Sequence, residues 1–63
     1  MTKNEIINPD NTITYELTPD ENKCFKSKAT GHKFIHTNGK QGLPLYVSEE
    51  EISLYEEIDI NGN

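Results

Sequence analysis

The chain has 63 residues, a formal net charge of −5 at pH 7 and a sequence pI of about 4.8. This length allows one small domain, which we expect to span residues 1–63, with residues 1–8 and 61–63 as candidates for disorder. The acidic balance argues against general affinity for DNA or anionic lipid, and no apolar run approaches the length needed to span a membrane.

Turn-forming residues divide the first third of the chain into short segments. The run NEII near the start is a candidate extra edge strand, and a proline turn at Asn8–Asn11 follows it. The run TITYEL alternates polar and apolar residues, so Ile13, Tyr15 and Leu17 should share one face of a strand. A second proline turn at Thr18–Asn22 ends that strand.

The middle of the chain reads as two turns between strands. Two predicted strands, residues 23–28 and 32–37, flank a turn at Gly31. The pair Asn38-Gly39 is the strongest short-range signal for a hairpin. We expect positive φ at both Gly31 and Gly39, because a side chain would strain these turns. The run LPLYV, residues 43–47, is a further strand, and its proline restricts it to a sheet edge or to a strand start.

Residues 48–60 carry two competing signals. Ser48 followed by Glu51 is a capping box, which favours a helix start. The spacing of the following isoleucines and leucine fits a strand better, so we predict a helical turn at 48–53 and then a strand at 55–60. A helix that continues through Glu57 is the alternative.

Together these segments predict a mainly β fold, with a small α+β fold as the alternative. We expect a four- to five-stranded antiparallel meander, curled or barrel-like, with one short helical turn near the C-terminus. The residues predicted to form its core are Ile13, Tyr15, Leu17, Phe25, Phe34, Leu43, Leu45, Val47, Leu54 and Ile58.

Charge is arranged in three blocks along the chain. Residues 1–21 hold one lysine against five acidic residues, residues 22–47 hold five lysines and no acid, and residues 48–63 hold six acids and no base. The basic block supplies a candidate interaction face that consists of Lys23, Lys26, Lys28, Lys33, Lys40 and Tyr46. The last block supplies a candidate acidic face that consists of Glu49, Glu50, Glu51, Glu56, Glu57 and Asp59.

The sequence contains no set of residues that points to catalysis or to a metal site. His32 and His36 would lie about 13 Å apart along a strand, too far for one zinc ion to bind both. Cys24, the only cysteine, has no evident orienting base and fits better as a small apolar strand residue. We therefore expect no enzymatic activity, metal or cofactor, and the lone thiol suggests a cytoplasmic location.

The run LYVSEEEISLYEEID, residues 45–59, resembles the C-termini of short phage and mobile-element accessory proteins. Those proteins end in a Tyr-Glu-Glu-aliphatic-acid pattern after a β-meander. The resemblance implies a small non-enzymatic protein from a mobile element, and it assigns a role to no individual residue.

These observations favour a non-enzymatic protein–protein interaction module of phage or prophage origin, which binds another protein or a second copy of itself. One alternative is a small β-barrel that binds nucleic acid through the lysine-rich hairpin 23–40. The absence of arginine and the acidic terminal block argue against it. A second alternative is an acidic inhibitor of a DNA-binding host enzyme, which would display carboxylates in place of phosphates.

Overall fold

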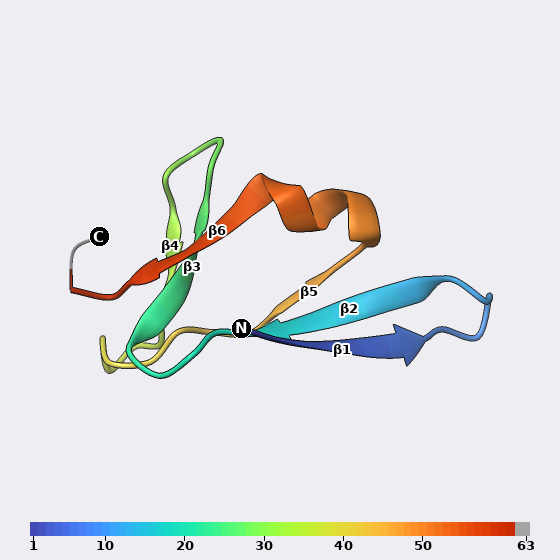
Figure 1. The fold of residues 1–63 in the computed structure, drawn as a ribbon, viewed down its shortest axis with the longest axis horizontal. Helices are drawn as coiled ribbons and strands as arrows, with labels where there is room; N and C mark the ends of the chain where they lie inside the picture. Colours follow the sequence, from blue (N-terminus) through green and yellow to red (C-terminus); the bar gives the residue numbers. More distant parts are fainter. Residues whose placement is uncertain (62–63) are drawn as a thin grey trace.

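A computed structural model describes residues 1–61, which form two three-stranded antiparallel sheets (Figure 1). The first sheet has the strand order β1-β2-β5 and consists of β1 (Thr2–Ile7), β2 (Ile13–Thr18) and β5 (Leu45–Val47). The second has the order β4-β3-β6 and consists of β3 (Lys23–Ser27), β4 (Lys33–Phe34) and β6 (Tyr55–Asp59). A short 3-10 helix, η1 (Glu49–Leu54), connects β5 to β6.

The mainly β class, the antiparallel pairing and the short helical turn near the C-terminus are confirmed. The connectivity differs from that of a simple meander. Only β1–β2 and β3–β4 are sequential neighbours, whereas β5 returns to β2 and β6 returns to β3. The chain leaves the first sheet after Thr18, where Pro19 cannot donate a main-chain hydrogen bond and Asn22 has a φ of 64°.

The turns follow the expected chemistry. Gly31 and Gly39 have φ values of 77° and 69°, which confirms both predictions. The Asn38-Gly39 reversal leads to an isolated bridge between Ile35 and Gly42 and not to a long hairpin, because the following residues leave to pair with β2.

The C-terminal segment is a helical turn followed by a strand, as predicted. The Ser48 N–H donates to Glu51 Oε1 at 2.9 Å, and the Glu51 N–H donates to the Ser48 carbonyl at 3.1 Å. Tyr55 ends the helix in an extended conformation, with φ −124° and ψ 152°. Glu57 therefore lies in β6, and the alternative of a continuous helix is wrong.

The core lies where the two sheets meet. Its buried residues are Tyr15, Leu17, Phe25 and Val47, and the half-buried Phe34, Leu45, Ile52 and Tyr55 pack against them. On β3, the neighbouring Cys24 and Phe25 are both buried, so this central strand is covered on both faces.

Two residues predicted to lie in the core are exposed instead. Ile13 is 41% exposed because the β1–β2 hairpin extends beyond the second sheet in a molecule that measures 38 × 22 × 17 Å (Figure 1). Leu54 is 52% exposed because η1 packs against the core through Ile52. The alternation of residues identified the correct face of β2, but it could not show how far the second sheet covers that face.

The first residues of the chain form an edge strand. β1 pairs with β2 along its whole length, from Thr2 opposite Thr18 to Ile7 opposite Ile13. β1 includes the run NEII, which we predicted as a candidate edge strand. It also covers most of residues 1–8, the segment named above as a candidate for disorder. At the other end, Asn61 lies in a turn, and residues 62 and 63 lie outside the described range.

Candidate functional site

The basic strand β3 lies directly beside the acidic strand β6. Lys23 is opposite Asp59 and Lys26 is opposite Glu56 in the strand register. The Lys23 Nζ lies 3.2 Å from Asp59 Oδ1, and the Lys26 Nζ lies 3.5 Å from Glu56 Oε1. Each pair is worth about 0–1 kcal/mol at the surface. Two members of the candidate basic face thus neutralise two members of the candidate acidic face.

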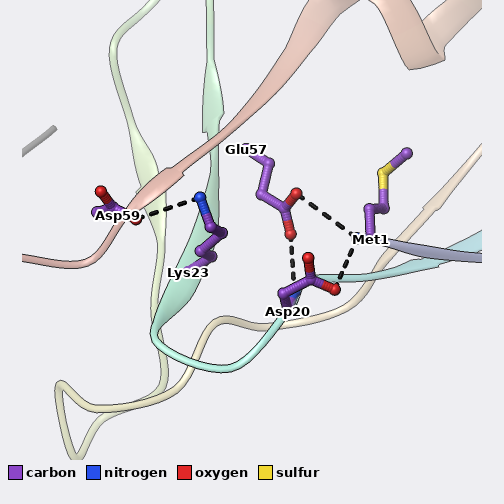
Figure 2. A network of polar contacts seen from close by, with 5 residues as sticks. All are labelled: Met1, Asp20, Lys23, Glu57 and Asp59. Atoms are coloured by element: carbon purple, nitrogen blue, oxygen red, sulfur yellow. Dashed lines mark hydrogen bonds and ion pairs between the residues drawn. The ribbon is translucent and has the colours of Figure 1, made fainter.

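Glu57 participates in a polar network that joins the two sheets (Figure 2). The Met1 ammonium lies 2.7 Å from Asp20 Oδ1 and 3.6 Å from Glu57 Oε1. The Asp20 N–H donates to Glu57 Oε2 at 2.7 Å. The hydrogen bond to Asp20 raises the pKa of the Met1 ammonium above its ordinary value. Glu57 therefore has a structural role in this network.

The remaining members of the basic face are spread over the molecule. Lys33 lies opposite Lys26, and both lysines are on the side of the second sheet that faces away from Phe25. Lys40 lies in the loop between β4 and β5 and lines an open hollow of about 520 Å³. Lys28 is exposed in the turn after β3.

Tyr46 lies on β5, in the other sheet. Its hydroxyl donates to Glu16 Oε2 at 2.8 Å, and this hydrogen bond raises the pKa of the phenol. The structure thus places Lys26 and Lys33 side by side on the second sheet and Tyr46 on the first, so the six residues of the candidate basic face do not lie on one surface.

The helical acids are divided between structure and surface. The Ser48 N–H and hydroxyl both donate to the Glu51 carboxylate, and these bonds lower its pKa. Glu49 and Glu50 are exposed and line a second hollow, of about 400 Å³, together with Ile13 and Tyr15.

The histidines and the cysteine do not form a common site. His32 and His36 are both exposed, and the His32 ring stacks edge-on against Phe34 with the ring centres 4.7 Å apart. Cys24 is completely buried. Within residues 1–61, no group of three or more His, Cys, Asp and Glu residues could hold a metal ion. The same part of the chain has no helix long and apolar enough to cross a membrane.

The outer edge of β1 is an open edge of the first sheet. All six residues of β1 are exposed, and the strand order places β1 at an end of the first sheet. Its outer main-chain groups therefore have no strand partner among the described residues. Ile7, 73% exposed, lies opposite Ile13 at the end of the hairpin.

Sequence reasoning included NEII as an edge strand but did not connect it with function. The residues of β1 alternate without an apolar face: Lys3, Glu5 and Ile7 lie on one side and Thr2, Asn4 and Ile6 on the other. Such a pattern is typical of a strand exposed on both faces. It was the feature of the sequence that could have indicated an exposed edge strand here.

No protein-family model matches the chain, and neither a curated protein nor a solved structure is significantly similar to it.

Proposed function

We propose that this chain is a non-enzymatic protein–protein interaction module that binds its partner through the outer edge of β1. The observation that carries the proposal is a six-residue strand with every residue exposed and one edge without a strand partner among residues 1–61. A strand of a partner can extend the sheet there, with main-chain hydrogen bonds that supply affinity and side chains that supply specificity.

The apolar residues near this edge support the proposal. Ile6 and Ile7 are both exposed on β1, and Ile13 lies beside Ile7 on the neighbouring strand. Burial of apolar surface contributes about 25 cal/mol per Å², so covering these side chains would add to the main-chain pairing.

The nucleic-acid-binding and acidic-inhibitor alternatives have less support, because ion pairs between β3 and β6 occupy residues that both would need. The ion pairs of Lys23 and Lys26 occupy two of the lysines that a nucleic-acid site on hairpin 23–40 would need. An acidic inhibitor would need carboxylates directed at its target, yet Glu56 and Asp59 contact those two lysines. A phage or prophage origin and a cytoplasmic location complete the proposal, supported by the resemblance of residues 45–59 and by the lone cysteine.

A proline at Glu5 tests the role of the edge. The Asn8 N–H donates to the Thr12 carbonyl, so the alternation of an antiparallel pair directs the Glu5 N–H away from β2. Proline at this position removes an outward donor, covers the edge with its ring and leaves the β1–β2 hydrogen bonds in place. The matched control is Lys28→Ala combined with Lys33→Ala, which alters the exposed lysines and leaves β1 intact.

The tagged chain is immobilised and exposed to a lysate of its native host, with an excess of untagged chain added. We expect the immobilised wild type and the immobilised lysine variant to retain the same partner, which is either a host protein or the untagged chain. Glu5→Pro should not retain that partner. Circular dichroism checks that all three are folded. Retention by Glu5→Pro, or loss in the lysine variant alone, would refute the use of the β1 edge.

A further inference from the structure

We infer that the partner of the β1 edge is a second copy of this chain, paired antiparallel through β1 about a two-fold axis at Asn4. This inference rests on the proposed function, because it uses the same edge. This pairing would join the β1-β2-β5 sheet of one copy to the same sheet of the other, giving one continuous sheet of six strands.

The main-chain groups of alternate residues of β1 point outward from the sheet. The Asn8 N–H donates to the Thr12 carbonyl at 2.8 Å, in the same register that pairs Ile7 with Ile13. In an antiparallel pair, hydrogen-bonded residues alternate with residues whose N–H and C=O point the other way. The N–H and C=O groups of Lys3, Glu5 and Ile7 therefore point toward the open edge.

Two-fold symmetry limits the possible registers of a β1–β1 pair. A two-fold axis perpendicular to the sheet keeps each face of the sheet continuous across the new contact. Such an axis has to place one residue of β1 opposite the same residue of the other copy. Centres near the ends of β1 pair few residues, which leaves Lys3, Asn4 and Glu5 as candidates for the central position.

The charges of β1 select one of these three registers. An axis at Lys3 or at Glu5 would place two like charges directly opposite each other, which is destabilising. An axis at Asn4 places Lys3 opposite Glu5 of the second copy, and Glu5 opposite Lys3. The strand is thus complementary to itself in one central register, with two pairs of opposite charge related by the symmetry.

The same register also brings exposed apolar side chains together. It places Ile7, 73% exposed, opposite Met1, 50% exposed, of the second copy. It likewise places Ile6 opposite Thr2, a pairing of the β-branched type that suits adjacent strands. A chain of 63 residues has a small core, and covering such residues in a dimer supplements it.

Charge exchange tests both the partner and the register. A Lys3→Glu chain presents two acidic residues at the edge, and a Glu5→Lys chain presents two lysines. Each variant should repel its own copy, whereas an equimolar mixture of the two should restore both opposite-charge pairs. Sedimentation velocity, over a series from micromolar to millimolar protein, measures the association. The control is Lys28→Glu, which changes charge in an exposed turn away from β1.

We expect the wild type and Lys28→Glu to dimerise and each edge variant to dimerise about tenfold more weakly or worse. The mixture should recover the affinity of the wild type. Dimers that persist in both edge variants, or a mixture that stays monomeric, would overturn the register and with it the inference.

A disulfide provides a second measurement that changes no charge. Asn4 would face its own copy in a non-hydrogen-bonded pair, with a Cα–Cα distance of about 4.5 Å, which suits a disulfide. Asn4→Cys should therefore form a covalent dimer on mild oxidation. Thr2→Cys should not, because Thr2 faces Ile6 in this register. The native Cys24 is buried and does not compete. Equal cross-linking of both variants would contradict the inference.

The outcomes separate this inference from the proposed function. A wild-type chain that stays monomeric at millimolar concentration overturns the self-pairing. If that monomer still retains another protein in a manner abolished by Glu5→Pro, the proposed function stands. If it retains none, both fall.

Discussion

Replacing Gly42 with alanine should destabilise the fold through a collision with main-chain atoms. A Cβ at this position would lie 2.5 Å from the Lys23 carbonyl oxygen, 2.7 Å from Pro19 Cγ and 2.8 Å from Cys24 Cα. Two of these atoms belong to the main chain of β3, the central strand of its sheet, and cannot rotate away. Gly42 is thus required by a close approach and not by a positive φ.

The expected cost follows from two opposing effects. Forcing extra volume into a packed site costs about 1–3 kcal/mol, and contact with fixed main chain places this site near the upper end. Restricting the unfolded chain returns about 0.4–1 kcal/mol. The net loss is about 2 kcal/mol, a large part of the roughly 3–9 kcal/mol typical of a domain of this size. The melting temperature should fall by about 10 °C.

Urea denaturation followed by circular dichroism measures this loss. The matched control is Gln41→Ala at the exposed neighbouring position, which should change the free energy of unfolding by no more than about 0.5 kcal/mol. Equal stability of the two variants would show that Gly42 does not approach β3 in the way described.

Three further predictions concern other parts of the molecule. The hydrogen bonds from Ser48 lower the folded-state pKa of Glu51, so they stabilise the fold at pH values above the unfolded-state pKa of this carboxyl group. This stabilisation is lost as the pH falls through the folded-state pKa. In urea titrations, the difference in unfolding free energy between the wild type and Glu51→Ala should therefore become smaller on acidification. The buried Cys24 thiol should resist an aromatic disulfide reagent in the native protein and react quickly in urea, and fast native reaction would contradict its burial. The wild type should not bind oligonucleotides at physiological salt, whereas Glu56→Gln combined with Asp59→Asn should bind weakly with a salt slope of about −0.7 per phosphate contact; tight binding by the wild type would favour the nucleic-acid alternative.

The local features of the fold were accessible from the sequence because they depend on neighbouring residues. Gly31 and Gly39 marked turns through their conformational freedom, and Ser48 with Glu51 marked the start of the helical turn. Alternation placed Tyr15 on the buried face of β2.

The long-range pairings were not accessible in the same way. The contacts of β5 with β2 and of β6 with β3 join segments about thirty residues apart, and no turn signal encodes them. The basic and acidic blocks held a partial signal, since Lys23 and Lys26 meet Asp59 and Glu56, but opposite charge alone does not specify a register.

The candidate site was largely missed for a related reason. Exposure of Ile7 and Ile13 depends on how far the second sheet extends, which is a property of the assembled fold. The sequence indicated that the acidic terminal block opposes the lysine-rich face, but it could not show that Lys23 and Lys26 are the lysines that β6 engages.

The crossing of the two long-range pairings has a consequence for how the molecule opens. β2 pairs with β5, and β3, which lies between them in the chain, pairs with β6 beyond them. Any cut between β2 and β6 therefore separates at least one hydrogen-bonded pair, and no contiguous fragment contains both pairings unless it runs from β2 to β6. Amide protons of the two sheets should accordingly exchange through one cooperative opening. A nick in the loop around Gly39 would leave two fragments that each contribute a strand to both sheets, so they should remain associated.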